Sequence, residues 1–413
     1  MKIWIRGTVL GDAIRLLLGS RWLGYPEDDP TFDFRQATSA SSLDERSHRD
    51  LESGQETFRC AEKLCTATKA DKSFIIHCVY TFIVYSGSSI FIPSYEFMML
   101  RYGVSIEVVQ LTLAIYVVGY GVGPLIFSPL SEIVCIGRNP PYVLSFILFV
   151  IVSIILAVID SFPAIVVLRF LQGFFSSPSL ASGGASIQDM FSLIDAPYAF
   201  IFWVTGFYCG PALGPLLSAY AVTPDWRWPL WEIVLMSAPL LLVIICLLPE
   251  TSHETILLRR AQRLRRFHPA VVAPAETKTI DFQAILIDAL IKPPEIAVKD
   301  PAIAYMCVYS SLVYAIYYSF FEAFPIAYGS IYQMPQTTLS LIYLSLIVGI
   351  AIYSGSSFVV FQALIVHVPL SYPRYVASLY AASDVTRSIT AAGFVMFARY
   401  MYLDLGIGKG VTV

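Results

Sequence analysis

Ten stretches of this sequence are apolar over a length that suits a helix crossing a membrane. A bilayer has a hydrocarbon core of about 30 Å, so a spanning helix needs about 20 mainly apolar residues. A helix also satisfies its own backbone hydrogen bonds, which lipid cannot do. The sequence therefore predicts an all-α polytopic membrane protein, with spans at residues 74–93, 108–130, 141–160, 163–187, 198–222, 229–249, 301–324, 337–353, 356–370 and 375–398.

Charged residues fall mainly between these apolar stretches. Residues 1–73 hold 11 Lys/Arg and 12 Asp/Glu, and residues 250–300 hold 8 and 7, whereas the other 289 residues hold only 8 and 11. Charge is costly in hydrocarbon and tolerated in loops. We therefore divide the chain into a mostly disordered tail at 1–72, a six-helix bundle at 73–249, a central loop at 250–300 and an incomplete bundle at 301–413.

The placement of Lys and Arg indicates the side of the membrane on which each loop lies. Cytoplasmic loops carry an excess of these residues near the spans. The excess here lies before the first span, between the second and third, and after the sixth, at Lys69, Lys72, Arg138, Arg259, Arg260, Arg263, Arg265 and Arg266. This pattern predicts a cytoplasmic N-terminus. Within the tail, the first 24 residues predict a short amphipathic segment.

An arginine lies deep in the fourth apolar stretch, in the sequence Arg169-Phe-Leu-Gln172. An arginine at this depth should face a cavity or a partner, because exposing it to lipid costs several kcal/mol. It is either a structural residue satisfied by backbone carbonyls or a fixed positive charge that biases a protonation site or binds an anionic group.

The fifth stretch carries small residues at four-residue spacing, in Gly206, Gly210, Pro211 and Gly214. Small residues let two helix backbones approach closely, and proline bends a helix. A GxxxG pattern alone indicates packing, and the longer GxxxGPxxG pattern is correspondingly more specific.

A carboxylate and an arginine, Glu132 and Arg138, flank the turn between the second and third stretches. Such residues cap helix ends or pair with each other. We expect them to form a charge latch that breaks and reforms during a conformational cycle.

These three stretches resemble the fourth-helix, fifth-helix and loop 2–3 signatures of the major facilitator superfamily. Further matches resemble the fungal twelve-helix drug:H+ antiporters of the benomyl and fluconazole resistance type, and include Gly121-Val-Gly-Pro-Leu, Trp226-Arg-Trp228 and Leu248-Pro-Glu-Thr251. The resemblance covers roughly residues 70–413. The chain departs from the usual pattern at Glu132-Ile133, where the family has an Asp-Arg pair, and at Gly214-Pro215, where it has Gly-Gly.

The resemblance implies a major facilitator fold with a complete six-helix N-terminal bundle and an incomplete C-terminal bundle. It also implies export of drugs, toxins or other small apolar molecules in exchange for protons, most simply across the plasma membrane. The partners are then the lipid bilayer, the substrate and protons, and no obligate protein partner is evident. A net charge of −3 gives no basic footprint for nucleic acid. The sequence shows no phosphate-binding loop, metal cluster or catalytic triad, so we expect neither a cofactor nor an enzyme.

Exchange for protons requires a group that takes up a proton on one side and releases it on the other. No acidic residue occurs between Phe74 and Pro93. Glu322 is the first candidate and Asp384 the second, accompanied by Arg169 and Arg387. Glu322 is alternatively a helix-end carboxylate at the interface, and Asp384 and Arg387, three residues apart, alternatively neutralise each other.

Aromatic residues make up 14% of the chain, and a cavity for varied apolar molecules needs such faces. Most of them are expected to face lipid or its interface. We predict that the cavity is lined by Tyr116, Tyr120, Phe207, Tyr314 and Phe321.

The second half is shorter than the twelve-helix family requires. Residues 337–353 and 356–370 form either two short spans, for ten in all, or one broken helix of about 51 Å, for nine. Only the nine-span arrangement keeps the family's direction for the last helix. The missing spans leave open a truncated remnant that does not transport, and an importer of nutrients is a further alternative that Gly206 to Gly214 disfavour.

Overall fold

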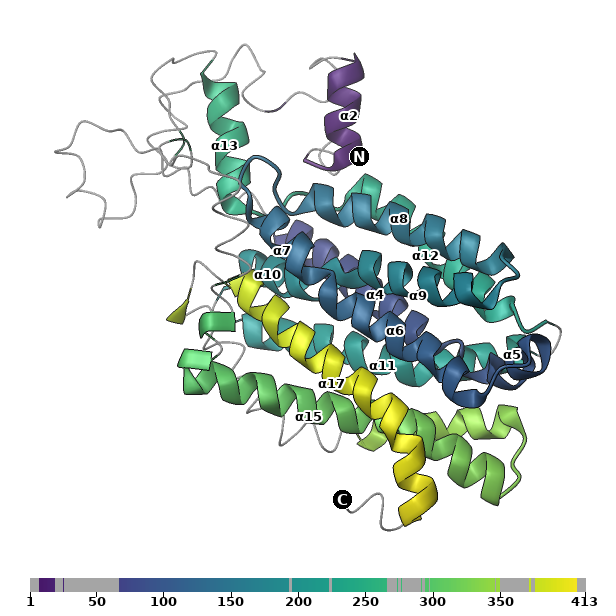
Figure 1. Cartoon of the computed structure of the whole chain (residues 1–413). Coiled ribbons are helices and arrows are strands. Elements are labelled where there is room, and N and C mark those ends of the chain that lie inside the picture. Colours follow the sequence, from purple (N-terminus) through teal and green to yellow (C-terminus); the bar gives the residue numbers. More distant parts are fainter. Residues whose placement is uncertain are drawn as a thin grey trace.

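The structure is a computed structural model whose ordered elements are helices packed side by side (Figure 1). The predicted disordered stretch at 25–72 lies largely outside the residues that it describes, and the predicted span at 356–370 lies wholly outside them. The described residues are 7–18, 25, 67–192, 195–222, 225–265, 273, 276, 291, 294–296, 298–345, 347–349, 371–372 and 376–406.

Seven helical stretches among the described residues are long and apolar enough to cross a membrane. They coincide with the first seven predicted spans, which are therefore confirmed. The helices that form them are α4 (Ala67–Ser89) with η4 (Ile92–Ser94) and α5 (Tyr95–Tyr102); α6 (Ile106–Val122) with α7 (Pro124–Glu132); α8 (Asn139–Val158); α9 (Phe162–Ser176) with η5 (Ser177–Ser179) and α10 (Ala181–Met190); α11 (Ala196–Ala221); α12 (Trp228–Leu247); and α15 (Pro301–Phe324) with η7 (Pro325–Ile331).

None of the last three predicted spans is among these seven helical stretches. A shorter apolar helix at Gln336–Gly349 overlaps the predicted span 337–353. The predicted span 375–398 is the long helix α17 (Val376–Leu405), which is not among the seven. α17 packs against α15 on one side and against α6 on the other, so it joins the second half of the chain to the first (Figure 1).

The outer faces of the bundle are apolar. Leu144 of α8, Leu235 and Leu242 of α12, and Ile316 of α15 are among the large hydrophobic side chains that are at least half exposed. Exposed residues of this kind are unfavourable in water but suit a surface surrounded by acyl chains. The inner faces of the same helices also bury serines, such as Ser145 of α8, Ser237 of α12 and Ser310 of α15, as is common in helices packed within a membrane.

Two short helices lie at one end of the bundle and run across the direction of its long helices, α2 (Val9–Leu18) and α13 (His253–Leu264) (Figure 1). Asp12 of α2 forms an ion pair with Arg259 of α13 at 3.1 Å. The backbone N–H of Glu250 also donates to the Gly7 carbonyl at 3.0 Å. The predicted N-terminal segment thus includes a helix fastened to the central loop, and we call this end of the bundle the α13 end.

An aspartate gathers three segments at the opposite end, which we call the α5 end. Asp160, between α8 and α9, accepts hydrogen bonds from Arg101 at 2.7 Å and from Tyr102 at 2.9 Å. Arg227, before α12, lies 2.9 Å from the same carboxylate. Hydrogen bonds from Arg101 and Tyr102 hold the pKa of Asp160 below its ordinary value. This carboxylate therefore ties three loop-facing segments together without burying them.

The spaced glycines of the fifth predicted span lie where α11 packs on α4. A Cβ at Gly210 would lie 2.8 Å from both the Phe82 carbonyl and the Tyr85 Cβ, closer than such atoms approach each other. Pro215 has no N–H for the Pro211 carbonyl, and Ser89 of α4 donates to that carbonyl at 2.7 Å instead. The motif therefore packs two helices and satisfies the carbonyl that its proline leaves without a helical donor.

α15 and α17 run in the same direction. Ser310 contacts Ser383 near their starts and Ser319 contacts Tyr402 near their ends, each pair at 3.3 Å between hydroxyl oxygens. Two spanning helices that run in the same direction must have an odd number of spans between them. The nine-span arrangement puts one span between α15 and α17, whereas the ten-span arrangement puts two, so the observed direction agrees with nine.

Candidate functional site

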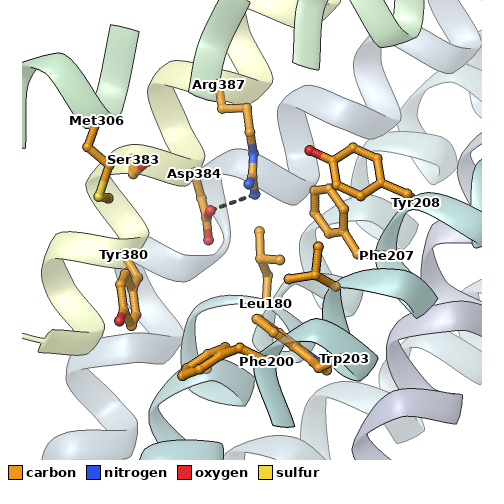
Figure 2. Close-up of a pocket in the computed structure, with 12 residues that line it drawn as sticks. Leu180, Phe200, Trp203, Phe207, Tyr208, Met306, Tyr380, Ser383, Asp384 and Arg387 are labelled. Atoms are coloured by element: carbon orange, nitrogen blue, oxygen red, sulfur yellow. Dashed lines mark hydrogen bonds and ion pairs between the residues drawn. The ribbon is translucent and has the colours of Figure 1, made fainter. Parts of the chain in front are cut away.

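A pocket lies between two sets of helices, α10 and α11 from the first half of the chain and α15 and α17 from the second. Its cavity volume is about 50 Å³, well below the several hundred Å³ of a typical small-molecule site. A drug-sized molecule therefore requires the two sets of helices to move apart. The lining residues are Leu180, Gly184, Phe200, Trp203, Val204, Phe207, Tyr208, Met306, Tyr380, Ser383, Asp384 and Arg387 (Figure 2).

An ion pair lies at the centre of this pocket. Arg387 Nη2 is 2.6 Å from Asp384 Oδ1, and the two side chains are only 7% and 6% exposed. The Arg387 guanidinium is also 4.8 Å from the ring centres of both Phe207 and Tyr314, in cation–π contact. Asp384 and Arg387 thus pair with each other, as one of the two alternatives held, and they do so on the wall of a pocket.

The pocket wall follows helical spacing that the sequence carries. On α17, Tyr380, Ser383, Asp384 and Arg387 recur at intervals of three and four residues and so share one helix face. On α11, Phe200, Trp203 and Phe207 do the same. The prediction named Phe207 and the charged pair but missed Phe200 and Trp203 on α11 and Tyr380 and Ser383 on α17. Counting back at helical spacing from Phe207 and Arg387 would have found these four.

The five predicted cavity aromatics separate in the structure. Phe207 lines the pocket, and Tyr314 lies behind it against Arg387. Tyr116 donates to the Val84 carbonyl at 2.7 Å and so packs between helices of the first half. Tyr120 and Phe321 are buried but do not line the pocket, since Tyr120 packs on Tyr85 and Phe321 on Tyr343.

Glu322 lies in a second buried site, outside the pocket. Its side chain is 4% exposed and accepts a hydrogen bond from the Gln110 side-chain amide of α6. Arg399 of α17 and the phenols of Tyr95 and Tyr343 interact with it electrostatically. Glu322 is two residues from the end of α15, as the interface alternative supposed, yet it is enclosed by protein.

Arg169 is fully buried, and its two terminal guanidinium nitrogens donate to groups around it. Its guanidinium donates to the Gly87 carbonyl at 2.9 Å, to Gln172 at 3.0 Å and to the Ser88 carbonyl at 3.2 Å. It also lies 5.2 Å from the Phe91 ring centre and 5.1 Å from that of Tyr116. These are the contacts of the structural alternative, because backbone carbonyls of α4 accept its hydrogen bonds.

The charged turn at the α13 end has a different partner from the one predicted. Arg138 forms an ion pair with Asp189 of α10 at 2.5 Å, whereas Glu132 contributes to the electrostatic surroundings of Arg138. Burial lowers the pKa of Arg138, but the Asp189 carboxylate outweighs this effect, so the net shift of the pKa is upward. The sequence could not select Asp189, because it is 51 residues away in the chain.

A second carboxylate completes this turn. Glu250 follows α12 and accepts hydrogen bonds from the backbone N–H groups of Arg138, Thr251 and Ser252 at 3.0, 3.1 and 3.0 Å. Backbone N–H groups at helix starts attract negative charge. Gly137 beside it has a φ of 81°, and a Cβ there would lie 2.4 Å from the carboxylate. Glu250 therefore binds the start of α8 to the start of α13.

Hydrogen bonds join the two halves on either side of the pocket. Gln188 of α10 donates to the Tyr380 hydroxyl at 2.7 Å, and Tyr317 of α15 donates to the Tyr208 carbonyl at 2.7 Å. The Glu322 site adds a link nearer the α5 end. Among the described residues, no group of three or more His, Cys, Asp or Glu side chains could hold a metal ion.

Comparison with known proteins gives a consistent set of matches. The sequence pattern described as Major Facilitator Superfamily matches residues 78–412. The MFS-type transporter pyvG of Aspergillus violaceofuscus is 36% identical, over 81% of this chain and 74% of its own length. The multidrug transporter FLR2 of Candida glabrata is 32% identical (82% and 69%), and the cycloheximide resistance protein of Candida maltosa is 28% identical (80% and 73%).

Solved structures resemble the fold at low sequence identity. The human organic anion transporter MFSD10 (TETRAN) aligns with a TM-score of 0.52 at 16% identity, over 84% of this chain and 96% of its own. The xylose transporter XylE from E. coli, in a partially occluded inward-open conformation, gives 0.51 at 11% identity, over 83% and 97%. At these identities the likeness concerns the fold alone.

Proposed function

Because the chain belongs to the Major Facilitator Superfamily, we propose that this membrane transporter exports small, largely apolar molecules in exchange for protons. The observation that carries the proposal is the Asp384–Arg387 pair, which lies in an aromatic pocket between the two halves. Apolar walls with few polar groups suit drug-sized molecules. Relatives named for multidrug transport and for cycloheximide resistance support the same substrate class.

Glu322 is the first proton carrier of this proposal. It is a buried carboxylate on α15 whose hydrogen bond from Gln110 crosses from one half to the other. Protonation removes the negative charge that strengthens this bond, since hydrogen bonds to ionised groups are roughly twice as strong as neutral ones. Uptake of a proton therefore weakens a link between the halves near the α5 end.

Asp384 is the second proton carrier, and Arg387 and Arg169 are the fixed positive charges of the scheme. Arg387 favours the ionised form of Asp384 in the state described, because the two side chains form an ion pair at 2.6 Å. A step that separates them would let Asp384 take up a proton. Arg169 donates hydrogen bonds to two carbonyls of α4. Tyr95, which follows α4 in the chain, interacts electrostatically with both Arg169 and Glu322.

Alternating access arises from movement of residues 73–249 against the described part of 301–413. The contracted pocket and the hydrogen bonds around it have to open on one side at a time. Arg138, with Glu132 nearby and Asp189 and Glu250 as its partners, latches helix ends at the α13 end. We place this end in the cytoplasm and the protein in the plasma membrane.

Reconstitution of the purified protein into liposomes tests the proposal. A fluorescent apolar dye should leave the compartment as protons enter it, and collapse of the proton gradient should stop the movement. Loss of the response in Glu322→Gln, with normal folding by circular dichroism, supports Glu322 as the carrier. Dye movement that ignores the proton gradient overturns proton coupling.

The rival is a remnant that does not transport. It is favoured by the described residues of the second half, in which Pro301–Ile331 is long and apolar enough to cross a membrane and the apolar helix at Gln336–Gly349 is shorter. The same liposomes decide between the two, since a remnant moves no dye in either direction at any proton gradient.

A further inference from the structure

One oxygen of the Asp384 carboxylate has no hydrogen-bond partner in the described part of the chain. Oδ1 accepts from Arg387 at 2.6 Å, whereas no described residue donates to Oδ2. The side chain is nevertheless only 6% exposed. A buried acceptor left without a donor costs about 1–3 kcal/mol, so a donor that reaches Oδ2 would be bound favourably.

The unpartnered oxygen lies in the pocket that the proposed function uses. Figure 2 shows the Asp384 side chain directed into the space between Tyr380 on one side and Leu180 and Phe200 on the other. The Trp203 indole N–H donates to Thr81 at 2.9 Å, so this residue offers the pocket its ring rather than its donor. The Phe200 and Trp203 rings meet edge to face with centres 5.8 Å apart. Together they form an aromatic wall beside an acceptor.

The charge of the pocket selects against cations. Among the lining residues, Asp384 and Arg387 carry the charges, and these cancel. The Arg387 guanidinium is also held between Phe207 and Tyr314. A cationic ligand would leave one net positive charge in a buried site, which is unfavourable. An uncharged N–H donor would satisfy Oδ2 without adding charge.

We propose that this pocket, once its two sets of helices have moved apart, binds flat, uncharged aromatic molecules by a hydrogen bond from a ring N–H to Asp384 Oδ2. The rings of Phe200 and Trp203 supply the apolar contact, and Arg387 orients the carboxylate through their ion pair. The inference rests on the proposed function in taking this pocket as the substrate site. It adds a requirement that apolar character alone does not impose, namely one hydrogen-bond donor on the ring edge.

A matched pair of ligands tests the donor. Carbazole has a ring N–H, and N-methylcarbazole has the same flat rings without it. Binding of each to the purified full chain in lipid nanodiscs is measured by equilibrium dialysis without a proton gradient, with empty nanodiscs as the correction for lipid uptake. Carbazole should bind at least tenfold more tightly than N-methylcarbazole. Equal affinities overturn the proposal, and so does an N-methylacridinium cation that binds as tightly as carbazole.

Variants place the effect at Asp384. In the doubly neutral variant Asp384→Asn with Arg387→Gln, the affinity ratio of the two ligands should fall from at least tenfold to within threefold. Asp404→Asn, an exposed position on the same helix, should keep the wild-type ratio. A ratio that stays high in the double variant overturns the assignment to Asp384. Should the double variant fail to fold, the wild-type ratio still decides whether the pocket requires the donor.

The two experiments distinguish failure of the donor requirement from failure of the proposed export. If carbazole is preferred but liposomes show no proton-driven movement, the donor requirement stands and the proposed export falls. If proton-driven movement occurs but the two carbazoles bind equally, export stands and the donor requirement falls.

Discussion

The Gln110 side chain of α6 donates a hydrogen bond to the buried carboxylate of Glu322 on α15. The two residues belong to different halves of the chain and are 212 positions apart. In the proposed function, the protonation state of Glu322 affects how tightly the two halves hold together through this bond.

Glu322→Gln should abolish the response of export to a proton gradient, with a fall of at least tenfold in gradient-driven dye movement. Glutamine has nearly the same size but cannot be ionised, so it keeps the packing and removes the titration. The measurement is dye movement in liposomes across a series of imposed proton gradients. Glu96→Gln, at an exposed position of α5, is the control and should transport normally. Wild-type coupling in Glu322→Gln rejects Glu322 as the carrier.

Gly210→Ala should destabilise the fold by about 1–3 kcal/mol, because the new Cβ would overlap the backbone of α4. The melting temperature in detergent should fall by several degrees. Gly393→Ala is the matched control, since a Cβ there meets nothing within 4 Å in the same kind of helix. The control should be neutral or slightly stabilising, as alanine favours helix. Equal melting temperatures of the two variants would contradict the packing role of Gly210.

Asp160→Asn should lower the melting temperature by about 1–2 °C at neutral pH. The hydrogen bonds from Arg101 and Tyr102 hold the pKa of Asp160 below its ordinary value. A carboxylate with a lowered folded-state pKa contributes stability above its unfolded pKa of about 3.9, and this contribution is lost as the pH falls through the folded value. The difference from wild type should therefore persist from pH 7 to about pH 4, and it should disappear only as the pH falls below the lowered folded-state pKa of Asp160.

Asp404→Asn serves as the control for this pH series, and its melting temperature should follow that of wild type throughout. A difference between wild type and Asp160→Asn that grows as the pH falls would have the wrong sign for a lowered pKa. It would show that the carboxylate is not stabilised by its three neighbours.

A tag fused after residue 413 should be accessible from outside intact cells, whereas a tag before residue 1 should not. The parallel course of α15 and α17 places the end of α17 at the same side of the membrane as the end of α15. With a cytoplasmic N-terminus, that side is external. The measurement is labelling of each tag by an impermeant reagent before and after permeabilisation. Two tags on the same side would contradict the nine-span arrangement.

Periodicity and apolar length predicted the helices well, because both are local properties of the chain. The first seven spans depend on runs of apolar residues that the sequence displays directly. Asp384 and Arg387 form an ion pair, as the alternative to a coupling role supposed, since three positions on a helix place two side chains on one face.

Contacts between helices were predicted less well, because the residues on one face of a helix do not show which other helix packs against that face. Tyr116 looked like a cavity residue, yet its hydroxyl binds a carbonyl of α4. Arg138 was expected either to cap a helix end or to pair with nearby Glu132, and its ion pair in the structure is with Asp189. Trp203 was not among the predicted cavity residues, and it lines the pocket only because α17 packs opposite it. Such partners depend on the arrangement of whole helices.

The position of Trp203 also has an optical consequence. Three of the chain's tryptophans, Trp226, Trp228 and Trp231, lie together at the α5 end, while Trp203 lines the pocket with its indole N–H bound to Thr81. Replacing those three by phenylalanine would leave Trp203 as the fluorophore of the described bundle. Its emission would then shift to longer wavelength as the pocket fills with water, so that the fluorescence of Trp203 in this triple variant would follow the opening and closing of the site.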